Sequence, residues 1–343
     1  MGRQKLSARI SRTLCGFAIA AMIVTSLPAR PAFAQDAIRI GTSSIGADYY
    51  ILAVAIGELL AKYETINATT EPIGGSHANI FGLAADKVEF AIVNASAAYD
   101  GYRGADPFPG PQPLRLVAQG HTTYRFIVVR RRENIDTPDG LRGKTIIARR
   151  RAMPEIEEVG NALLNVSQIA PNDVRFVGTV DTTQVEEALR AGTVAGAVMP
   201  GSIDQPALQG LFRDEIVDFL YLDDATVTSM MDDLPAIFLK DVIPAGSFPG
   251  QTQDLIALGL NVYFVSDEGM SDDIVYRTIK TIRENYDEFT TYFSSAAAWT
   301  VENALREPRI PYHLGAIRYY REIGVWNDEM ENLQNNLLGA QQP

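Results

Sequence analysis

Cysteine and histidine are scarce in this chain of 343 residues, which contains one cysteine and three histidines. A single cysteine excludes a disulfide within the chain and a metal site built from several cysteines. The histidines, His77, His121 and His313, do not have the His-Glu-x-x-His spacing of a zinc hydrolase. The sequence also lacks the Gly-x-Ser-x-Gly nucleophile motif, the Walker loop and the Rossmann fingerprint. We therefore expect no catalytic residues, no metal and no cofactor, and we expect that the protein is not an enzyme.

Basic residues are outnumbered by acidic ones. Lysine and arginine together number 30, against 42 aspartates and glutamates, so the formal net charge is −12. Because nucleic acids and anionic lipid surfaces select proteins with a basic face, the charge argues against both as partners. Hydrophobic residues make up 46% of the chain and charged residues 21%, as in a globular protein. The length is sufficient for two domains, since a single core rarely exceeds about 250–300 residues.

A long hydrophobic run is missing as well. The apolar stretch from Leu14 to Leu27 is shorter than the ~20 residues that a membrane-spanning helix needs. Four basic residues precede it: Arg3, Lys5, Arg9 and Arg12. Ala32-Phe33-Ala34 follows it and has the small-residue pattern of a signal-peptide cleavage site. Residues 1–34 are therefore predicted to be a cleaved signal peptide, with a membrane anchor as the alternative. Cleavage removes five basic residues and changes the net charge from −12 to −17. The signal peptide indicates a periplasmic protein.

The remaining sequence alternates short apolar runs with amphipathic helical stretches, which is typical of an α/β fold with mostly parallel strands. Leu114–Gly120 and Arg125–Val129 are predicted as two separate strands. A second series of strands and helices begins after Thr137-Pro138, and apolar runs near residue 260 predict a return to the first lobe. The predicted division is lobe one from residues 35–132 and 259–343, and lobe two from residues 133–258.

Two helix starts are marked by side chains that accept hydrogen bonds from main-chain N–H groups. Asp181 is predicted to cap the helix Thr182–Ala191. Ser271 is predicted to cap a long helix whose first turn carries Asp272 and Asp273, where the helix dipole favours negative charge.

A cleft between two such lobes, at the carboxyl ends of the strands, is where α/β folds of this kind bind ligands. Helix N-termini meet there, and their free N–H groups favour anions. Two loops have suitable composition. Residues 41–46 combine hydroxyl groups with glycines before a helix, and Gly74-Gly75-Ser76 lets the main chain approach a ligand closely.

Four stretches of the sequence carry a family resemblance. They are, in order, IRIGTSSIGADYYILAVAIGELLAK, IGGSHANIFGLAADKVEFAIVNASAAYDGYRG, IPAGSFPGQTQDLIALGLNVYFV and IPYHLGAIRYYREIGVW. In these stretches the chain resembles the solute receptors of TRAP transporters, specifically the TAXI family. The similarity extends from about Ile38 to Trp326.

The resemblance implies an α/β, two-lobe periplasmic-binding-protein fold of type II, with a ligand cleft between the lobes. Such a receptor performs no chemistry. It encloses a small carboxylate, such as glutamate or 2-oxoglutarate, and delivers it to the subunits of a TRAP-type membrane permease. We also expect a monomer. A ligand-sensing protein that presents its closed form to a sensor kinase is the alternative.

One departure from the family pattern follows the strand that ends near Ala148. The family usually has a Gly-Ser-Gly-Thr loop there, whose main-chain N–H groups can hold an anion. This chain has Arg149, Arg150 and Arg151, followed by Pro154, which has no N–H. We predict that Arg149 or Arg150 holds a ligand carboxylate with its planar fork of donors. A solvated basic run is the alternative.

A second departure lies at Ser96, where the family commonly has an aspartate. A serine cannot pair with a ligand ammonium group as an aspartate can. The lost acid and the added arginines favour a keto acid or dicarboxylate over an amino acid. The alternative is that the position does not touch the ligand.

Adjacent tyrosines cannot share one face of a helix, so we predict that Tyr50 faces the cleft and Tyr49 lies in the core. The predicted ligand-binding residues are Thr42, Ser43, Ser44, Tyr50, Ser76, Asn79, Asn94, Ser96, Arg149 and Arg150.

Overall fold

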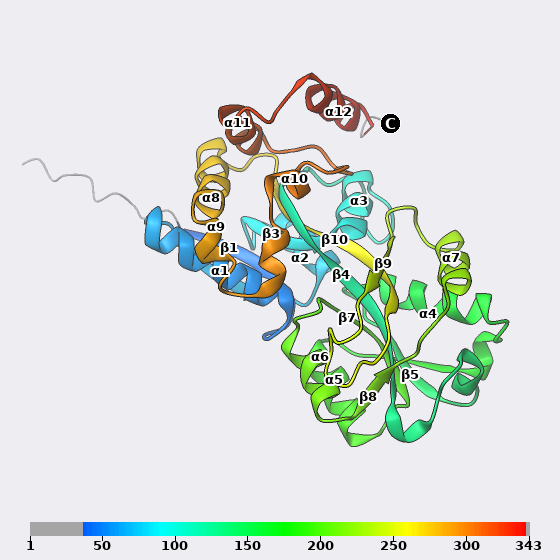
Figure 1. Cartoon of the computed structure of the whole chain (residues 1–343). Coiled ribbons are helices and arrows are strands. Elements are labelled where there is room, and N and C mark those ends of the chain that lie inside the picture. Colours follow the sequence, from blue (N-terminus) through cyan, green and yellow to red (C-terminus); the bar gives the residue numbers. More distant parts are fainter. Residues whose placement is uncertain (1–36, 341–343) are drawn as a thin grey trace, which may run out of the picture. The chain divides into compact units, whose positions relative to one another are not determined.

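The computed structural model describes residues 37–340 (Figure 1). The predicted signal peptide lies outside these residues. None of the helices within them combines the length and the apolar character that a bilayer crossing requires.

The described residues begin with a series of three parallel strands and three helices. Its elements are β1 (Ala37–Thr42), α1 (Asp48–Tyr63), β2 (Asn67–Pro72), α2 (Ser76–Ala84), β3 (Phe90–Asn94) and α3 (Ala95–Arg103). β1 pairs with both β2 and β3 in parallel. The carboxyl ends of these strands therefore lie at one edge, together with the starts of the helices that follow them.

Two long strands, β4 (Leu114–Arg130) and β10 (Leu255–Asp267), pair with each other in antiparallel fashion. Between them the chain forms a second series: β5 (Thr145–Arg149), α4 (Glu155–Val166), β6 (Arg175–Gly178), α5 (Thr182–Ala191), β7 (Gly196–Gly201), α6 (Pro206–Arg213), β8 (Val217–Phe219), α7 (Asp224–Asp232) and β9 (Leu239–Ile243). The helices after β10 are α8 (Asp272–Glu284), α9 (Tyr286–Phe289), α10 (Val301–Ala304), α11 (Leu314–Glu322) and α12 (Asp328–Gly339).

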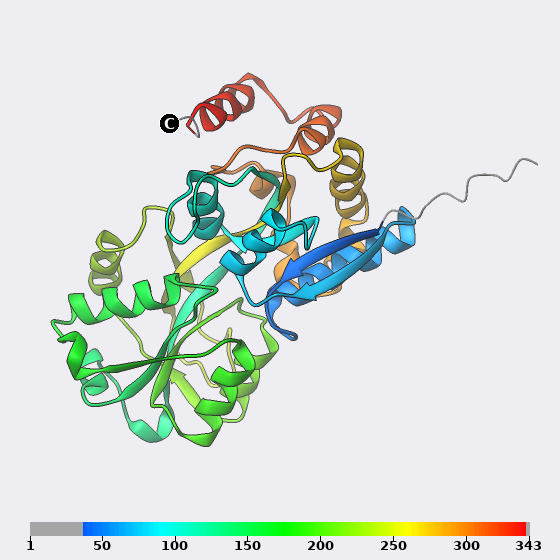
Figure 2. The same ribbon diagram turned by 180° about the vertical axis from the view of Figure 1, so that it is seen from behind.

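Hydrogen bonds connect all ten strands in the order β2-β1-β3-β10-β4-β7-β5-β6, with β8 on β4 and β9 on β10. β4 and β10 run from one strand series into the other, as Figures 1 and 2 show from opposite sides. β4 is continuous where the sequence predicted two strands, so that expectation was wrong. Its polar stretch between Gly120 and Tyr124 stays in the ladder because β10 pairs with it.

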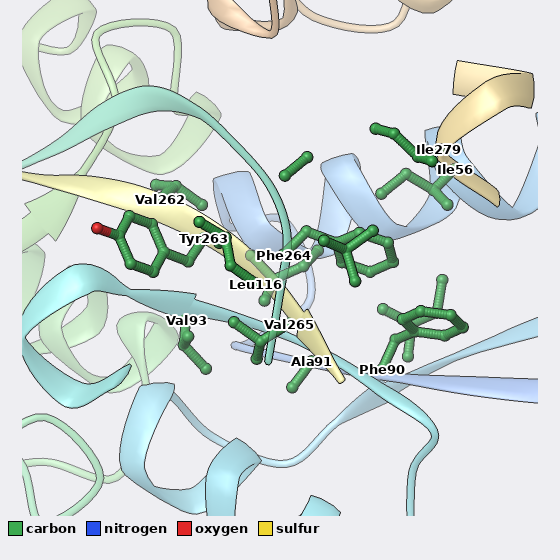
Figure 3. Close-up of a cluster of buried hydrophobic side chains, with 14 of the residues drawn as sticks. Ile56, Phe90, Ala91, Val93, Leu116, Val262, Tyr263, Phe264, Val265 and Ile279 are labelled. Carbon is green, nitrogen blue, oxygen red and sulfur yellow. The ribbon is translucent and has the colours of Figure 1, made fainter. Parts of the chain in front are cut away.

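The buried apolar side chains form separate clusters on the two series. One cluster draws on residues 38–118 and 262–320, and Figure 3 shows part of it, where Phe90 stacks on Phe264 with ring centroids 4.9 Å apart. Two others draw on residues 124–260. We call residues 37–118 with 262–340 lobe one, and residues 124–260 lobe two. The chain passes between these cores inside β4. The lobe boundaries at residues 132 and 258 stay a prediction.

Both predicted helix caps are present. The Asp181 side chain accepts from the Gln184 N–H at the start of α5. The Ser271 side chain accepts from the Ile274 N–H at the start of α8, whose first turn carries Asp272 and Asp273. These two predictions are confirmed.

Candidate functional site

The last residue of β1 and the loop between β1 and α1 carry three buried hydroxyl side chains. Thr42 Oγ1 donates to the carbonyl of Glu71 on β2 (3.3 Å), which ties the loop to the neighbouring strand. Ser44 Oγ accepts from the Thr182 N–H of lobe two (3.3 Å). Ser43 Oγ is buried without a hydrogen-bond partner among the described residues. The loop therefore touches lobe two and keeps one hydroxyl group free.

The Gly-Gly-Ser loop before α2 also meets lobe two. A Cβ on Gly75 would lie 2.8 Å from Met153 Cγ and 3.2 Å from the Ala152 oxygen, so only glycine permits this approach. The next turn adds a main-chain contact, in which the His77 N–H donates to the Ala152 carbonyl (3.2 Å). Ser76 Oγ accepts from the Asn94 N–H at the end of β3 (3.0 Å).

The side chains of Asn79 and Asn94 form hydrogen bonds to different parts of the structure. Asn79 Nδ2 donates to the carbonyl of Ile92 on β3 (2.7 Å), so this side chain joins α2 to the sheet. Asn94 Oδ1 accepts from the Ala97 N–H and caps α3. Asn94 Nδ2 donates across to Glu155 Oε1 of lobe two (2.7 Å). Asn94 therefore links the two lobes.

A buried ion pair lies beside Asn94. Arg125 Nη2 of β4 donates to Glu155 Oε1 (2.7 Å), and both side chains are almost fully buried. Arg125 Nε and Glu155 Oε2 have no hydrogen-bond partner among the described residues. A buried pair loses much of its hydration, and its remaining donors and acceptors are costly to leave unmatched. This pair consequently offers unused polar atoms next to the contact between the lobes.

Arg150 is the second buried arginine, with 4% of its surface exposed. Its Nη1 lies 3.5 Å from both Met153 Sδ and Thr182 Oγ1. Its Nε and Nη2 have no partner among the described residues. Burial lowers the pKa of Arg150 to about 10, against the opposing effect of Glu155 and Asp181. The guanidinium is still a cation at neutral pH.

Tyr49 joins this cluster. Its hydroxyl is buried and has no hydrogen-bond partner within residues 37–340. Burial, and then the charge of Asp48, raises its pKa well above the ordinary value, while Arg125 and Ser76 act in the opposite direction. Tyr50, the predicted cleft residue, is half-buried on the neighbouring face of α1. Tyr49 is thus buried in the core of lobe one, as predicted, and the role of Tyr50 in the cleft stays a prediction.

Two other predicted residues lie apart from the cluster. The Arg149 side chain is 53% exposed and donates to Glu157 Oε1 (2.8 Å). Ser96 is buried but lines a separate cavity of about 170 Å³, together with Tyr99, Ile237 and Arg309.

The polar interlobe cluster thus consists of five predicted residues, Ser43, Ser44, Ser76, Asn94 and Arg150, and four that the sequence analysis missed, Tyr49, Arg125, Glu155 and Thr182. Thr42 and Asn79 position its loops. A signal for Arg125 was available, because it is the one charged residue between Leu116 and Val129.

A groove of about 390 Å³ adjoins the cluster. We call it the Arg150 groove. Its residues are Ile73, Gly74, His77, Ala78 and Phe81 of lobe one, and Arg150, Arg151, Ala152, Thr179 and Val180 of lobe two. Within residues 37–340, no group of three or more His, Cys, Asp or Glu side chains is arranged to hold a metal ion.

Similar folds occur among solved structures. MatC from Rhodopseudomonas palustris, solved with bound malate, has a TM-score of 0.55 at 12% identity; the match covers 87% of this chain and all of MatC. A structure described as a periplasmic transporter has a TM-score of 0.50 at 13% identity, covering 90% of this chain and 96% of that one. At these identities the likeness establishes the fold. It is the two-lobe α/β fold of periplasmic substrate-binding proteins.

A family match covers most of the chain as well. Residues 40–324, which include the whole interlobe cluster, match the NMT1-like family. The chain therefore belongs to the NMT1-like family.

Proposed function

We propose that this protein is an extracytoplasmic solute receptor that binds a small organic anion between its lobes. The observation that carries the proposal is Arg150, a buried cation whose Nε and Nη2 donors are unused. The Thr182 hydroxyl of lobe two lies 3.5 Å from Arg150 Nη1, and the Thr182 N–H donates to Ser44 Oγ of lobe one. A charge-assisted hydrogen bond from a buried guanidinium is stronger than one between neutral groups.

Contacts between the lobes suggest how binding would be signalled. Ser44 with Thr182, and Asn94 with Glu155, join lobe one to lobe two around the cluster. A ligand that touches both sides adds contacts only in the closed arrangement, so it shifts the equilibrium towards closure. A membrane partner can then distinguish the loaded receptor from the empty one.

The ligand classes to test first come from two sources. The sequence resemblance implies a dicarboxylate, a keto acid such as 2-oxoglutarate, or glutamate. The malate bound to MatC adds a hydroxy dicarboxylate to this set. Ser96 does not lie in the cluster. The serine that replaces the family's aspartate there is therefore not used to choose among these acids.

The proposed partner is a TRAP-type permease, and the proposed compartment is the periplasm, with residues 1–34 removed and the receptor acting as a monomer. Deleting the gene tests the partner. Loss of uptake of the bound acid supports a permease. Unchanged uptake together with a lost transcriptional response to that acid supports the sensor kinase.

A thermal-shift screen of organic acids and amino acids tests the binding proposal directly. A ligand present at 100 times its dissociation constant stabilises the folded state by about 2.7 kcal/mol. We expect organic acids to raise the melting temperature, and we expect Arg150→Gln to abolish the shift. A protein stabilised only by neutral or cationic solutes contradicts the proposal.

A further inference from the structure

The Arg150 groove has apolar walls on both sides. Lobe one contributes Ile73, Ala78 and Phe81, and lobe two contributes Ala152 and Val180. Phe81 is 41% exposed and Val180 is 65% exposed, which leaves much apolar surface in contact with water. Covering such surface with an apolar group is favourable in proportion to the area removed from water. The walls therefore favour a ligand that carries a hydrocarbon portion.

Arg150 is the buried cation among the residues that line the same groove. Its Nη1 is occupied by Met153 Sδ and Thr182 Oγ1, which leaves Nε and Nη2. These two N–H groups lie on one edge of the planar guanidinium and point in the same direction, so they match the two oxygens of one carboxylate. Thr179 Oγ1, also a groove residue, is buried without a partner in the described part of the chain and can add one hydrogen bond.

The buried charges indicate how many carboxylates the cluster balances. Arg125 is matched by Glu155 at 2.7 Å, whereas Arg150 forms no ion pair among the described residues. Among the residues that line the groove, Arg150 is therefore the one buried arginine, and it has no ion-pair partner within residues 37–340. Arg151 also lines the groove, but it is exposed, and water and salt screen its charge. A second carboxylate would find no second buried arginine in the groove.

From these observations we infer that the ligand is a monocarboxylate with an apolar body. Its carboxylate lies on the Nε–Nη2 edge of Arg150, and its hydrocarbon portion lies between Phe81 and Val180. The inference rests on the proposed function and narrows the acids named there.

Calorimetry with a matched pair of acids tests it. 2-Oxopentanoate and 2-oxoglutarate share a five-carbon chain and a keto group, and they differ in the terminal carboxylate. We expect 2-oxopentanoate to bind at least tenfold more tightly. The branched acid 4-methyl-2-oxopentanoate should bind more tightly again by about fourfold, which corresponds to one more buried methylene-sized group.

Two variants test the carboxylate end and the hydrocarbon end of the ligand separately. Arg150→Gln should weaken 2-oxopentanoate by about 10- to 150-fold, whereas Arg149→Gln, which changes an exposed arginine outside the groove, should leave it within twofold. Val180→Ser should weaken 4-methyl-2-oxopentanoate several-fold and acetate hardly at all. Val242→Ser, at an exposed valine on β9, serves as its control.

The results of these experiments separate failure of this inference from failure of the proposed function. If 2-oxoglutarate, glutarate or malate binds more tightly than the matched monocarboxylate, the inference is overturned while an organic-anion receptor stands. If Val180→Ser leaves the branched acid unaffected, the apolar contact is overturned. If no acid of either series binds the native protein, the proposed function fails together with the inference.

Discussion

The carboxylate of Asp204 accepts two hydrogen bonds from Ser295, one from the main-chain N–H (2.8 Å) and one from the hydroxyl group (2.7 Å). Asp204 follows β7 in lobe two, and Ser295 lies between α9 and α10 in lobe one. Ser294 Oγ adds a third bond across the lobes (2.8 Å), and Ser202 Oγ adds one within lobe two (2.7 Å). These bonds join the two lobes through residues other than those of the polar interlobe cluster.

Replacing Asp204 should therefore weaken closure. We expect Asp204→Ala to lower the affinity for 2-oxopentanoate by about fivefold, equivalent to about 1 kcal/mol for hydrogen bonds to a partly exposed charge. Calorimetry measures this change. Asp139→Ala is the control, because Asp139 pairs with Arg142 at the exposed surface of lobe two. Equal affinities for the two variants would show that Asp204 does not contribute to closure.

The same carboxylate predicts a dependence of stability on pH. Burial raises the pKa of Asp204, but the bonds from Ser202, Ser295 and Ser294 outweigh burial and lower the pKa from 3.8 to about 2. A carboxyl group with a lower pKa in the folded state stabilises it above the unfolded-state value, and that contribution disappears as the pH falls towards the folded-state value.

Urea unfolding of the native protein and of Asp204→Asn measures this effect. The difference between their free energies of unfolding should be constant from pH 7 to about pH 5 and should decrease between about pH 4 and pH 2. A difference that grows as the pH falls would have the wrong sign for this ionised carboxylate.

The Arg125–Glu155 pair predicts an asymmetry between single and double variants. Arg125→Met alone leaves the Glu155 carboxylate buried without its nearest cation and should cost about 3–5 kcal/mol of unfolding free energy. Arg125→Met combined with Glu155→Leu removes both charges and should recover part of that loss. Chemical denaturation of the four proteins in this cycle gives the coupling energy. If the double variant loses more unfolding free energy than the two single variants lose together, the explanation is contradicted.

The sequence was sufficient for those features that depend on local pattern. Asp181 and Ser271 marked the starts of α5 and α8 because a capping side chain bonds within its own first turn. Alternating strands and helices indicated the α/β class for the same reason. β4 was split in two because Gly120, His121 and Thr122 suggest a turn. Only the pairing of this stretch with β10, which is distant in the sequence, keeps it extended.

The site was predicted less completely because its geometry depends on tertiary packing. Tyr49 lies in the core as predicted, but its position beside Arg125 depends on β4, which is distant in the sequence. Arg149 and Arg150 differ by one position at the end of a strand, and one position reverses the direction of a side chain. Glu155 acquires its role only when β4 places Arg125 beside it.

A pair of adjacent glycines tests whether the approach of the lobes controls binding. Gly74 and Gly75 both have positive φ, 126° and 150°, so alanine strains the main chain at either position. A Cβ on Gly74 meets nothing within 4 Å, whereas one on Gly75 meets Met153 of lobe two at 2.8 Å. We expect the two alanine variants to lose similar stability in urea. Gly75→Ala should bind 2-oxopentanoate at least fivefold more weakly than Gly74→Ala, because its methyl group pushes lobe two away from lobe one. Equal affinities in calorimetry would mean that the contact between Gly75 and Met153 is not needed for closure around the ligand.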